Sequence, residues 1–452
     1  MAQIFTEKVC ELVGRRYDPD YVRFRHRQKS FRYPAVALGK LISARPEYGA
    51  AEPGVEREDF SQVRYVRITD IDEHGVLSSD LGATVENVDS KYLLKTGDVL
   101  FARSGNAVGK CYCHDSSLIG YPCIYAGYMI RFRFGPDVLP KFVFAFAQTP
   151  YFHEWVSSVR QAAGRPNINA QGYSDIEIPL PQLTVQRRLV AELDAAYAAK
   201  RAADQQAAAL LASIDDMVMT ELGITKLPLR DNSLSARIFM TPLREMVGGR
   251  SDAIAYQSVR MDFYRNIWSG KFAAEDLSSL VEVRREQTDD VSDQTYIGLE
   301  NINGEDGSCI ATADKEACSS AVLFAKGLIL FPKLRPYLNK VWLAEFDGVA
   351  STEFIPLEAV GISADYLTVF LRMRVVAETM RVLMTGNTLP RVQLGDVLSL
   401  PIPVPPKDIQ QKIAEQANTI KANAKRLKAY AVDQLMAVKK RIEKELMDNS
   451  KV

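Results

Sequence analysis

The chain has 452 residues, 47% of them hydrophobic and 25% charged, which is enough for two or three domains with cores of their own. Its 56 basic and 56 acidic residues give a formal net charge of zero, which argues against a general nucleic-acid coat protein. No run approaches eighteen consecutive apolar residues and the first residues lack an apolar signal core, so we expect a cytoplasmic protein with no membrane span.

The first part of the chain alternates short β-rich runs with helical patches. Strands are predicted where β-branched and aromatic residues cluster between Gly, Pro and Asn, at residues 65–69, 98–103 and 128–134. A helical patch is expected over residues 140–161. This half is therefore predicted to be a mixed α and β domain.

A proline-rich run and a long helix follow, in the segment IPLPQLTVQRRLVAEL at residues 178–193. Pro179 and Pro181 cannot donate ladder hydrogen bonds and favour an extended path. Thr184 is a suitable N-cap and Gly223 is a suitable residue just beyond a helix end, so a helix is predicted over 184–222.

The rest of the chain repeats this order of strands, a helical patch and a proline-rich joint. The joint reads IPVPPKDIQQKIAEQ at residues 402–416, where Asp408 and Gln411 have the spacing of a capping box at the start of a second long helix. The strands and the helical patch of this half are predicted at 295–299, 327–334, 340–346 and 364–384.

Matching stretches fall in the same order in both halves, with nearly constant spacing. YVRITDI at Tyr65 matches YIGLENI at Tyr296, and GDVLFARSGNAVGK at Gly97 matches GLILFPKLRPYLNK at Gly327. Chance similarity between apolar runs would not keep this register. We therefore infer an internal duplication of a whole domain with its helical tail, on a period longer than that of a solenoid repeat.

Both predicted helices carry an alanine-rich heptad seam. Two such helices of similar length in one chain are expected to pair with each other. If the halves are related by a two-fold axis, the helices run antiparallel and hold the globular domains at opposite ends of a rod. The seam residues include Leu189, Ala196, Ala203, Leu210 and Met217 in the first helix and Ile413, Ala417, Ile420, Ala424, Leu427 and Ala431 in the second.

These stretches resemble the specificity (S) subunits of type I restriction–modification enzymes. The resemblance lies in the two proline-rich joints and in FPKLRPYLNKVWLAEF and GNTLPRVQLGDVLSLPIPVPP of the second half, and it extends from about Arg16 to the C-terminus. It implies an α+β fold of two mixed α/β target-recognition domains in a pseudo-two-fold repeat, separated by a long antiparallel coiled-coil helix pair. The recognition domains are expected at 1–183 and 223–406, and the helices at 184–222 and 407–452.

The resemblance also implies a function. Each recognition domain is expected to read one half of a bipartite, asymmetric target in double-stranded DNA. The helix pair is expected to set the spacer and to dock two modification (methyltransferase) subunits, through which restriction subunits join. S-adenosylmethionine, ATP and magnesium are then expected on the partner subunits, and this chain is expected to have no cofactor and no catalytic residue.

Two sets of polar residues are candidate DNA contacts, because Arg, Lys and Asn on loops bind phosphate oxygens or pair with base edges. The first set lies near Gly97–Lys110 and Gly327–Lys340, and the second precedes each proline-rich run. The alternative for each residue is an ordinary solvated loop position. The candidates are Arg103, Lys110, Lys333, Arg335, Tyr337, Asn339 and Lys340 in the first set and Arg165, Asn167, Asn387 and Arg391 in the second.

The remaining motifs support neither catalysis nor a bound metal. CYCH at Cys111–His114, with Cys123 nearby, does not have the spacing of the usual zinc-binding pairs, so reduced thiols are expected. GNAVGK at Gly105–Lys110 is one residue short of a phosphate-binding loop. No G-x-G-x-x-G follows a predicted strand, and the four histidines form no nucleophile–base arrangement.

Two alternatives belong to other classes of protein. One is a self-contained DNA methyltransferase or nuclease with its own recognition domains, which a catalytic motif would reveal. The other is a coiled-coil scaffold without DNA contact. The loops rich in Arg, Lys and Asn at matching places in both halves argue against the scaffold.

Overall fold

The chain forms two compact units in the computed structural model, which describes residues 23–24, 30–159, 167–225, 240, 258–289, 294–310, 320–386 and 389–448. Unit 1 comprises Met1–Arg201 and Tyr430–Val452, and unit 2 comprises Ala202–Ala429. These limits differ from the domain boundaries expected from the sequence, which separated the long helices from the globular parts. They differ because the two ends of each long helix belong to the hydrophobic cores of different units.

Unit 1 contains two four-stranded sheets. The first has the order β3-β10-β7-β8 and is antiparallel throughout, whereas the second has the order β4-β6-β5-β9 and pairs β5 with β9 in parallel. The strands of these sheets are β3 Glu47–Tyr48, β4 Val55–Glu56, β5 Arg64–Val66, β6 Ala83–Thr84, β7 Val99–Ala102, β8 Cys111–Cys113, β9 Cys123–Tyr125 and β10 Met129–Phe132. Two short antiparallel pairs complete the unit, namely β2 Ala35–Ala37 with β11 Glu177–Pro179 and β1 Ser30–Phe31 with β22 Met447–Asp448.

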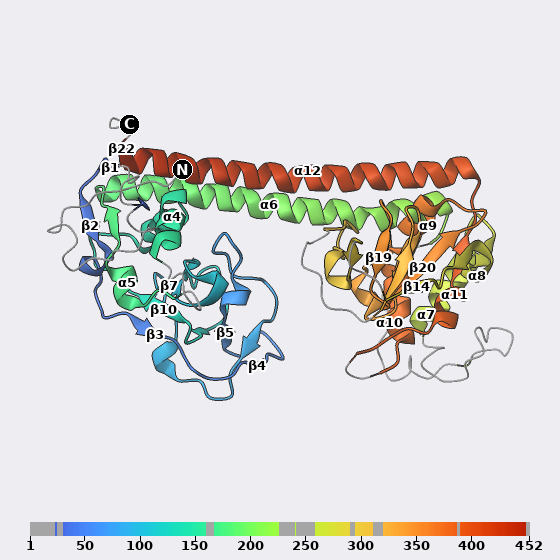
Figure 1. Ribbon diagram of the computed structural model, residues 1–452, viewed down its shortest axis with the longest axis horizontal. Helices are drawn as coiled ribbons and strands as arrows, with labels where there is room; N and C mark the ends of the chain where they lie inside the picture. The colour runs from blue at the N-terminus through green and yellow to red at the C-terminus, as the bar shows by residue number, and fades with distance from the viewer. Residues whose placement is uncertain are drawn as a thin grey trace. The chain divides into compact units, whose positions relative to one another are not determined.

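The main core of unit 1 lies between the first sheet, three shorter helices and one end of each long helix (Figure 1). β7 reads VLFA and is buried at every residue, as its continuous apolar run predicts. Phe101 of β7 stacks on Tyr173 with 4.8 Å between ring centroids, and the Tyr173 hydroxyl donates to Ala102 O (2.6 Å). The helices are α3 Pro140–Ala147, α4 Pro150–Val159 and α5 Ala170–Ser174.

Unit 2 repeats this architecture. Its antiparallel sheet has the order β13-β20-β17-β18, and its other sheet has the order β14-β16-β19-β15, in which β15 and β19 are parallel. The second sheets differ in one pairing, because β6 pairs with β5 in unit 1 whereas β16 pairs with β19 in unit 2. The predicted α+β fold with an internal repeat is therefore confirmed, with this one difference in strand order.

The elements of unit 2 have the following bounds. Its strands are β12 Ala274–Asp276, β13 Val281–Val283, β14 Gln287–Thr288, β15 Tyr296–Ile297, β16 Ala321–Phe324, β17 Ile329–Pro332, β18 Trp342–Leu343, β19 Gly348–Ala350, β20 Phe354–Ala359 and β21 Pro401–Pro403. Its helices are α7 Ser258–Trp268, α8 Leu277–Leu280, α9 Ala364–Leu371, α10 Arg374–Leu383 and α11 Leu394–Leu398. The proline-rich run before each long helix is extended as predicted, since β11 and β21 are edge strands of two-stranded pairs.

The helices α6 Leu183–Leu222 and α12 Lys407–Leu446, with 40 residues each, run antiparallel in each unit. In unit 1 the start of α6 lies beside the end of α12, where Arg188 forms an ion pair with Glu445. In unit 2 the end of α6 lies beside the start of α12, where Lys412 pairs with Glu221 (2.7 Å). The predicted antiparallel coiled coil is thus confirmed.

Small and aliphatic side chains form the seam between α6 and α12. Alanines at these positions let two helices approach closely, as the heptad pattern predicted. Leu210, Ile420 and Leu427, which the pattern also placed on the seam, are only partly buried. The buried seam residues are Leu189, Leu193, Ala431, Leu435 and Ile442 in unit 1 and Ala203, Ala207, Val218, Leu222, Ile413, Ala417 and Ala424 in unit 2.

In unit 1 a buried glutamine closes the joint at the start of α6. Gln186 has no exposed surface, and its Nε2 donates to Pro181 O (2.9 Å) and Asp137 O (3.1 Å). Its Oε1 accepts from Leu139 N (2.8 Å), the residue that precedes α3. One carboxamide therefore links the proline-rich run, the long helix and the first helix of the globular part.

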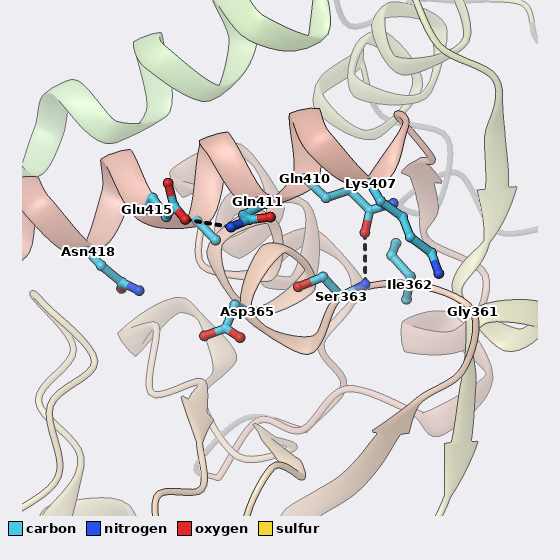
Figure 2. A pocket seen from close by; sticks show the side chains of 10 residues that line it. Gly361, Ile362, Ser363, Asp365, Lys407, Gln410, Gln411, Glu415 and Asn418 are labelled. Atoms are coloured by element: carbon cyan, nitrogen blue, oxygen red, sulfur yellow. Dashed lines mark hydrogen bonds between the residues drawn. The ribbon is translucent and has the colours of Figure 1, made fainter.

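The joint of unit 2 has the same construction. Gln410 is 3% exposed, its Nε2 donates to Pro405 O (2.8 Å), and its Oε1 accepts from Ser363 N (2.8 Å). Ser363 is the N-cap of α9, so it corresponds to the residue before α3 in unit 1. Figure 2 shows the hydrogen bond from Ser363 N to Gln410 Oε1 at the wall of a polar groove, where Lys407, Asp365 and Asn418 also lie.

The N-caps expected from the sequence are wrong. α6 begins at Leu183, which places Thr184 inside the first turn. α12 begins at Lys407, so Asp408 and Gln411 cannot form a capping box. α6 begins one residue earlier than expected and α12 begins at the expected residue, and in both helices the backbone carbonyl just before the helix accepts the first-turn N–H groups. The buried glutamine, and not a cap, then holds the first turn in place.

Replacing Gln410 with methionine is expected to destabilise unit 2, because methionine matches glutamine in length but cannot bond to Pro405 O or Ser363 N. An unpaired buried polar group costs about 1–3 kcal/mol, so the free energy of unfolding should fall by roughly 2–4 kcal/mol. Chemical unfolding measures this loss. The matched control is Gln411→Met, because Gln411 is exposed and bonds to Glu415 on the helix surface (Figure 2). Equal stability of the two variants would contradict the role of Gln410.

Candidate nucleic-acid interface

The two sets of candidate residues meet in unit 1. Arg103 begins the loop after β7, and Asn167 is the first described residue of the second segment. Ser104 and Asn167 form an isolated β-bridge, and Ile168 N donates to Arg103 O (2.8 Å). Two loops far apart in the sequence therefore bring a guanidinium group and a carboxamide to one place.

Two tyrosines extend this place into a surface. The Cζ of Arg103 lies 4.8 Å from the ring centroid of Tyr48, which ends β3 and is 40% exposed. Tyr128 is 38% exposed, and its carbonyl accepts a hydrogen bond from Arg103 N (3.0 Å). An arginine over an aromatic ring has a restricted orientation and can still donate to phosphate or base acceptors. Patch 1 denotes Tyr48, Arg103, Tyr128 and Asn167.

The same two segments meet in unit 2. Arg335 N donates to Pro390 O (3.0 Å), and Val392 N donates to Lys333 O (3.0 Å). The loop after β17 therefore runs beside residues 389–392, as the loop after β7 runs beside Asn167 in unit 1. Patch 2 denotes Lys333, Arg335, Tyr337 and Arg391.

Within patch 2 a carboxylate holds Arg391. Its Nε lies 3.0 and 3.1 Å from the two Glu353 oxygens, and its Nη2 donates to one of them at 2.7 Å. These bonds hold the pKa of the Glu353 carboxyl below its usual value against the effect of burial, and Lys333 adds to the lowering. Arg391 is thus oriented and partly neutralised within patch 2.

Three of the predicted candidates are engaged inside their own unit. Lys110 Nζ donates to Ile71 O (2.8 Å) in unit 1, and the equivalent Lys340 Nζ donates to Leu299 O (2.6 Å), in the matching segment of unit 2. Asn339 Nδ2 donates to Arg372 O (2.7 Å). These side chains hold their loops to the neighbouring segment, which is a structural role that the sequence did not indicate.

Sequence reasoning and geometry differ at further positions. Arg165 and Asn387 lie outside the described residues. Tyr48 and Tyr128 were not among the predicted residues, although both belong to patch 1. No signal in the sequence distinguishes an exposed tyrosine at a strand end from a buried one, because tyrosine is common in both environments.

The cysteine cluster does not assemble a metal site. No group of three or more His, Cys, Asp or Glu side chains is placed to hold a metal ion in the ranges that the structure describes. Cys113 lies on β8 whereas Cys123 lies on β9 of the other sheet, and His114 Nδ1 bonds to the hydroxyl of Tyr112 (3.0 Å). Burial raises the pKa of Cys113 to about 12 and that of Cys123 to about 11, so both stay protonated at neutral pH.

None of the helices in the described ranges is both long enough and apolar enough to cross a bilayer. The long helices α6 and α12 carry charged side chains along their length, as their ion pairs illustrate.

Among curated proteins, one relative shares part of the sequence. The Type I restriction enzyme EcoDI specificity subunit of Escherichia coli is 29% identical over 101 residues, which are 22% of this chain. The chain therefore spans about a fifth (22%) of the length of this curated relative. No family model matches the chain. The predicted resemblance to type I specificity subunits is confirmed by this relative.

Solved structures are also similar to the chain. One is a structure described as the basis of complex assembly and conformational transition of the type I R-M system. It is 14% identical to this chain with a TM-score of 0.47, and the match covers 92% of this chain and 96% of that one. The HsdS subunit from Thermoanaerobacter tengcongensis is 14% identical with a TM-score of 0.34 and the same coverage. The type I S subunit from M. genitalium is 11% identical with a TM-score of 0.38, covering 94% and 98%.

The internal hydrogen bond of Lys110 predicts a loss of stability when its ammonium group is removed. A hydrogen bond that involves a charged group contributes about 1.5–3 kcal/mol, so Lys110→Met should lower the free energy of unfolding by roughly that amount. Lys333→Met is the control, because the Lys333 side chain is partly exposed and a surface substitution typically changes stability by about 0.5 kcal/mol or less. Chemical unfolding of both variants tests the difference. A Lys110→Met variant as stable as Lys333→Met would show that the bond to Ile71 is unimportant.

Proposed function

We propose that the chain is the non-catalytic DNA-specificity subunit of a type I restriction–modification complex. The observation that carries the proposal is the duplicated loop pair, in which the same two segments meet in both units and carry Arg, Lys, Asn and Tyr side chains. Arg and Lys neutralise phosphates, and Arg and Asn pair with guanine and adenine edges. The curated specificity subunit that matches part of the chain supports the same function.

Each unit reads one half of a bipartite, asymmetric target in double-stranded DNA. Patch 1 combines one arginine with two tyrosines and an asparagine, whereas patch 2 combines two arginines, a lysine and one tyrosine. Base recognition depends on which donors and apolar groups reach the base edges. A duplicated scaffold with different side chains in its two loops therefore suits a target whose two halves differ.

The helix pair sets the spacer between the half-sites. Half-sites read from one face of a duplex lie about 34–36 Å apart for each helical turn that separates them. A helix of 40 residues is roughly 60 Å long at about 1.5 Å per residue. Continuous helices are stiff over this length, so they suit a spacer that does not vary.

Two modification subunits dock on the helix pair and the adjoining surfaces, and restriction subunits join through them. The joint that Gln186 closes is repeated by the joint that Gln410 closes, which supports two equivalent docking sites. S-adenosylmethionine, ATP and magnesium are bound by the partner subunits. A net charge of zero fits this arrangement, because the partners can supply part of the phosphate contact.

The complex of this chain with its modification subunits is expected to methylate DNA at one bipartite sequence. Sequencing the methylated positions gives both half-sites and the spacer.

Arg103→Ala should relax the base preference in one half-site and Arg335→Ala should relax it in the other, each by about 1–3 kcal/mol per affected base pair. Lys326→Ala is a control, because Lys326 is exposed before β17, whereas patch 2 begins after this strand. A contiguous target, or a wild-type complex without sequence preference, contradicts the proposal, and methyl transfer by the isolated chain would instead indicate an enzyme.

Shortening both long helices by one heptad should shorten the spacer. Removing residues 203–209 and 424–430 preserves the register of the ion pairs at both ends of the helix pair. Seven residues correspond to about 10 Å of helix, which is roughly 3 base pairs at about 3.4 Å each. The complex should then methylate unchanged half-sites separated by a shorter spacer. An unchanged spacer would mean that the helices do not determine it.

A further inference from the structure

The loop after β17 has an unusual backbone in unit 2. Arg335 (φ 47°) and Asn339 (φ 55°) flank a short 3-10 turn at Pro336–Leu338. In the described part of the chain, they are the two non-glycine residues with positive φ. Side chains other than glycine adopt this left-handed conformation at a cost in free energy, and such conformations cluster at functional sites.

The corresponding loop of unit 1 has the same shape but different side chains. There the left-handed positions are Gly105 (φ 76°), which begins the 3-10 turn Gly105–Ala107, and Gly109 (φ 91°), which follows it. Glycine adopts this conformation without strain. Unit 2 therefore keeps the loop geometry although Arg335 opposes it, whereas asparagine tolerates it at Asn339.

The base of the unit 2 loop is held firmly. Pro336 is buried, Arg335 N donates to Pro390 O (3.0 Å), and the Arg372 guanidinium donates to Asn339 O (2.7 Å). Gly304 packs so closely on the carbonyl of Leu338 that it leaves no room for a side chain. The turn therefore has little freedom to fold its tip back onto the unit.

The tip of the loop presents apolar surface to solvent. Tyr337 is 38% exposed and the adjacent Leu338 is 44% exposed. The apolar finger denotes these two residues. In unit 1 the residues that align with the finger are Ala107 and Val108, which are both only partly exposed, and Val108 packs against the core. The exposed residue of this turn is the polar Asn106, so unit 1 has no large apolar tip.

The surroundings of the finger indicate its ligand. Lys333, Arg335 and Arg391 lie in the same loop pair, so the apolar tip is bordered by positive groups. A duplex offers the complementary surface, in which phosphates border the apolar faces and methyl groups of the bases. Aliphatic and aromatic side chains on rigid supports make such contacts with bases.

We propose that Tyr337 and Leu338 enter the half-site read by unit 2 and pack against its bases, so that the finger contributes sequence preference and not phosphate affinity. This inference rests on the proposed function, and it makes the two half-sites chemically unlike. Unit 1 reads its half through polar groups and stacked tyrosine, whereas unit 2 adds an apolar contact with the bases.

Binding of the full complex to its mapped target and to an unrelated duplex tests the finger at several salt concentrations. The double variant Tyr337→Ala with Leu338→Ala should lose about tenfold or more in affinity for the target, as a lost base contact does. Its affinity for the unrelated duplex and the slope of log K against log salt should stay unchanged. Lys333→Ala should instead lower that slope by about 0.9 and weaken both duplexes alike.

Val360→Ala is the matched control, because Val360 is an apolar residue of unit 2 that is 45% exposed and lies outside both patches. It should leave target affinity unchanged, and thermal unfolding should show that all variants are folded. The inference is overturned if the double variant retains target affinity, or if it loses target and unrelated binding equally with a reduced salt slope. A wild-type complex without sequence preference would instead overturn the proposed function, so the two failures are distinguishable.

Discussion

A buried carboxamide holds each long helix to the globular part from which it emerges. Gln186 and Gln410 each bond to a proline carbonyl behind them and to the backbone N–H at the start of a helix in the same unit. The proline-rich run supplies few donors of its own, so without the glutamine the joint would be held mainly by two-stranded edge pairing. Because these bonds are buried, breaking them leaves polar groups unpaired, and the direction of the first helical turn is therefore well defined.

The two units keep the same supports while their exposed groups differ. Lys110 and Lys340 both bond to the backbone of the neighbouring segment, and the loops that they anchor both use left-handed residues. At the loop tip the side chain has diverged from Ala107 in one unit to Tyr337 in the other. Specific binding requires rigid support beneath variable contacts, and the shared tethers provide that support in both units.

The sequence predicted the features that depend on local pattern. The two long helices, their antiparallel pairing and the extended proline runs follow from heptad spacing and from the missing donors of proline. Details that depend on long-range contacts were missed or wrong. Thr184 was expected as a cap because no local signal reveals that the buried Gln186 holds the first turn through distant backbone groups. Lys110 was grouped with DNA contacts because its bond to Ile71 crosses 39 residues.

By itself the sequence determined the duplication, the alternation of mixed domains with helices, and the two segments of each half that carry Arg, Lys and Asn. These are properties of order and spacing along the chain. Only the tertiary structure decided that the two segments meet through the bridges of Asn167 and Arg391, that Tyr48 lies under Arg103, and that Tyr337 is presented on a rigid turn. The physical reason is that exposure and contact depend on what the rest of the fold places beside a residue, and residues 103 and 167 become neighbours only when the strands between them are paired.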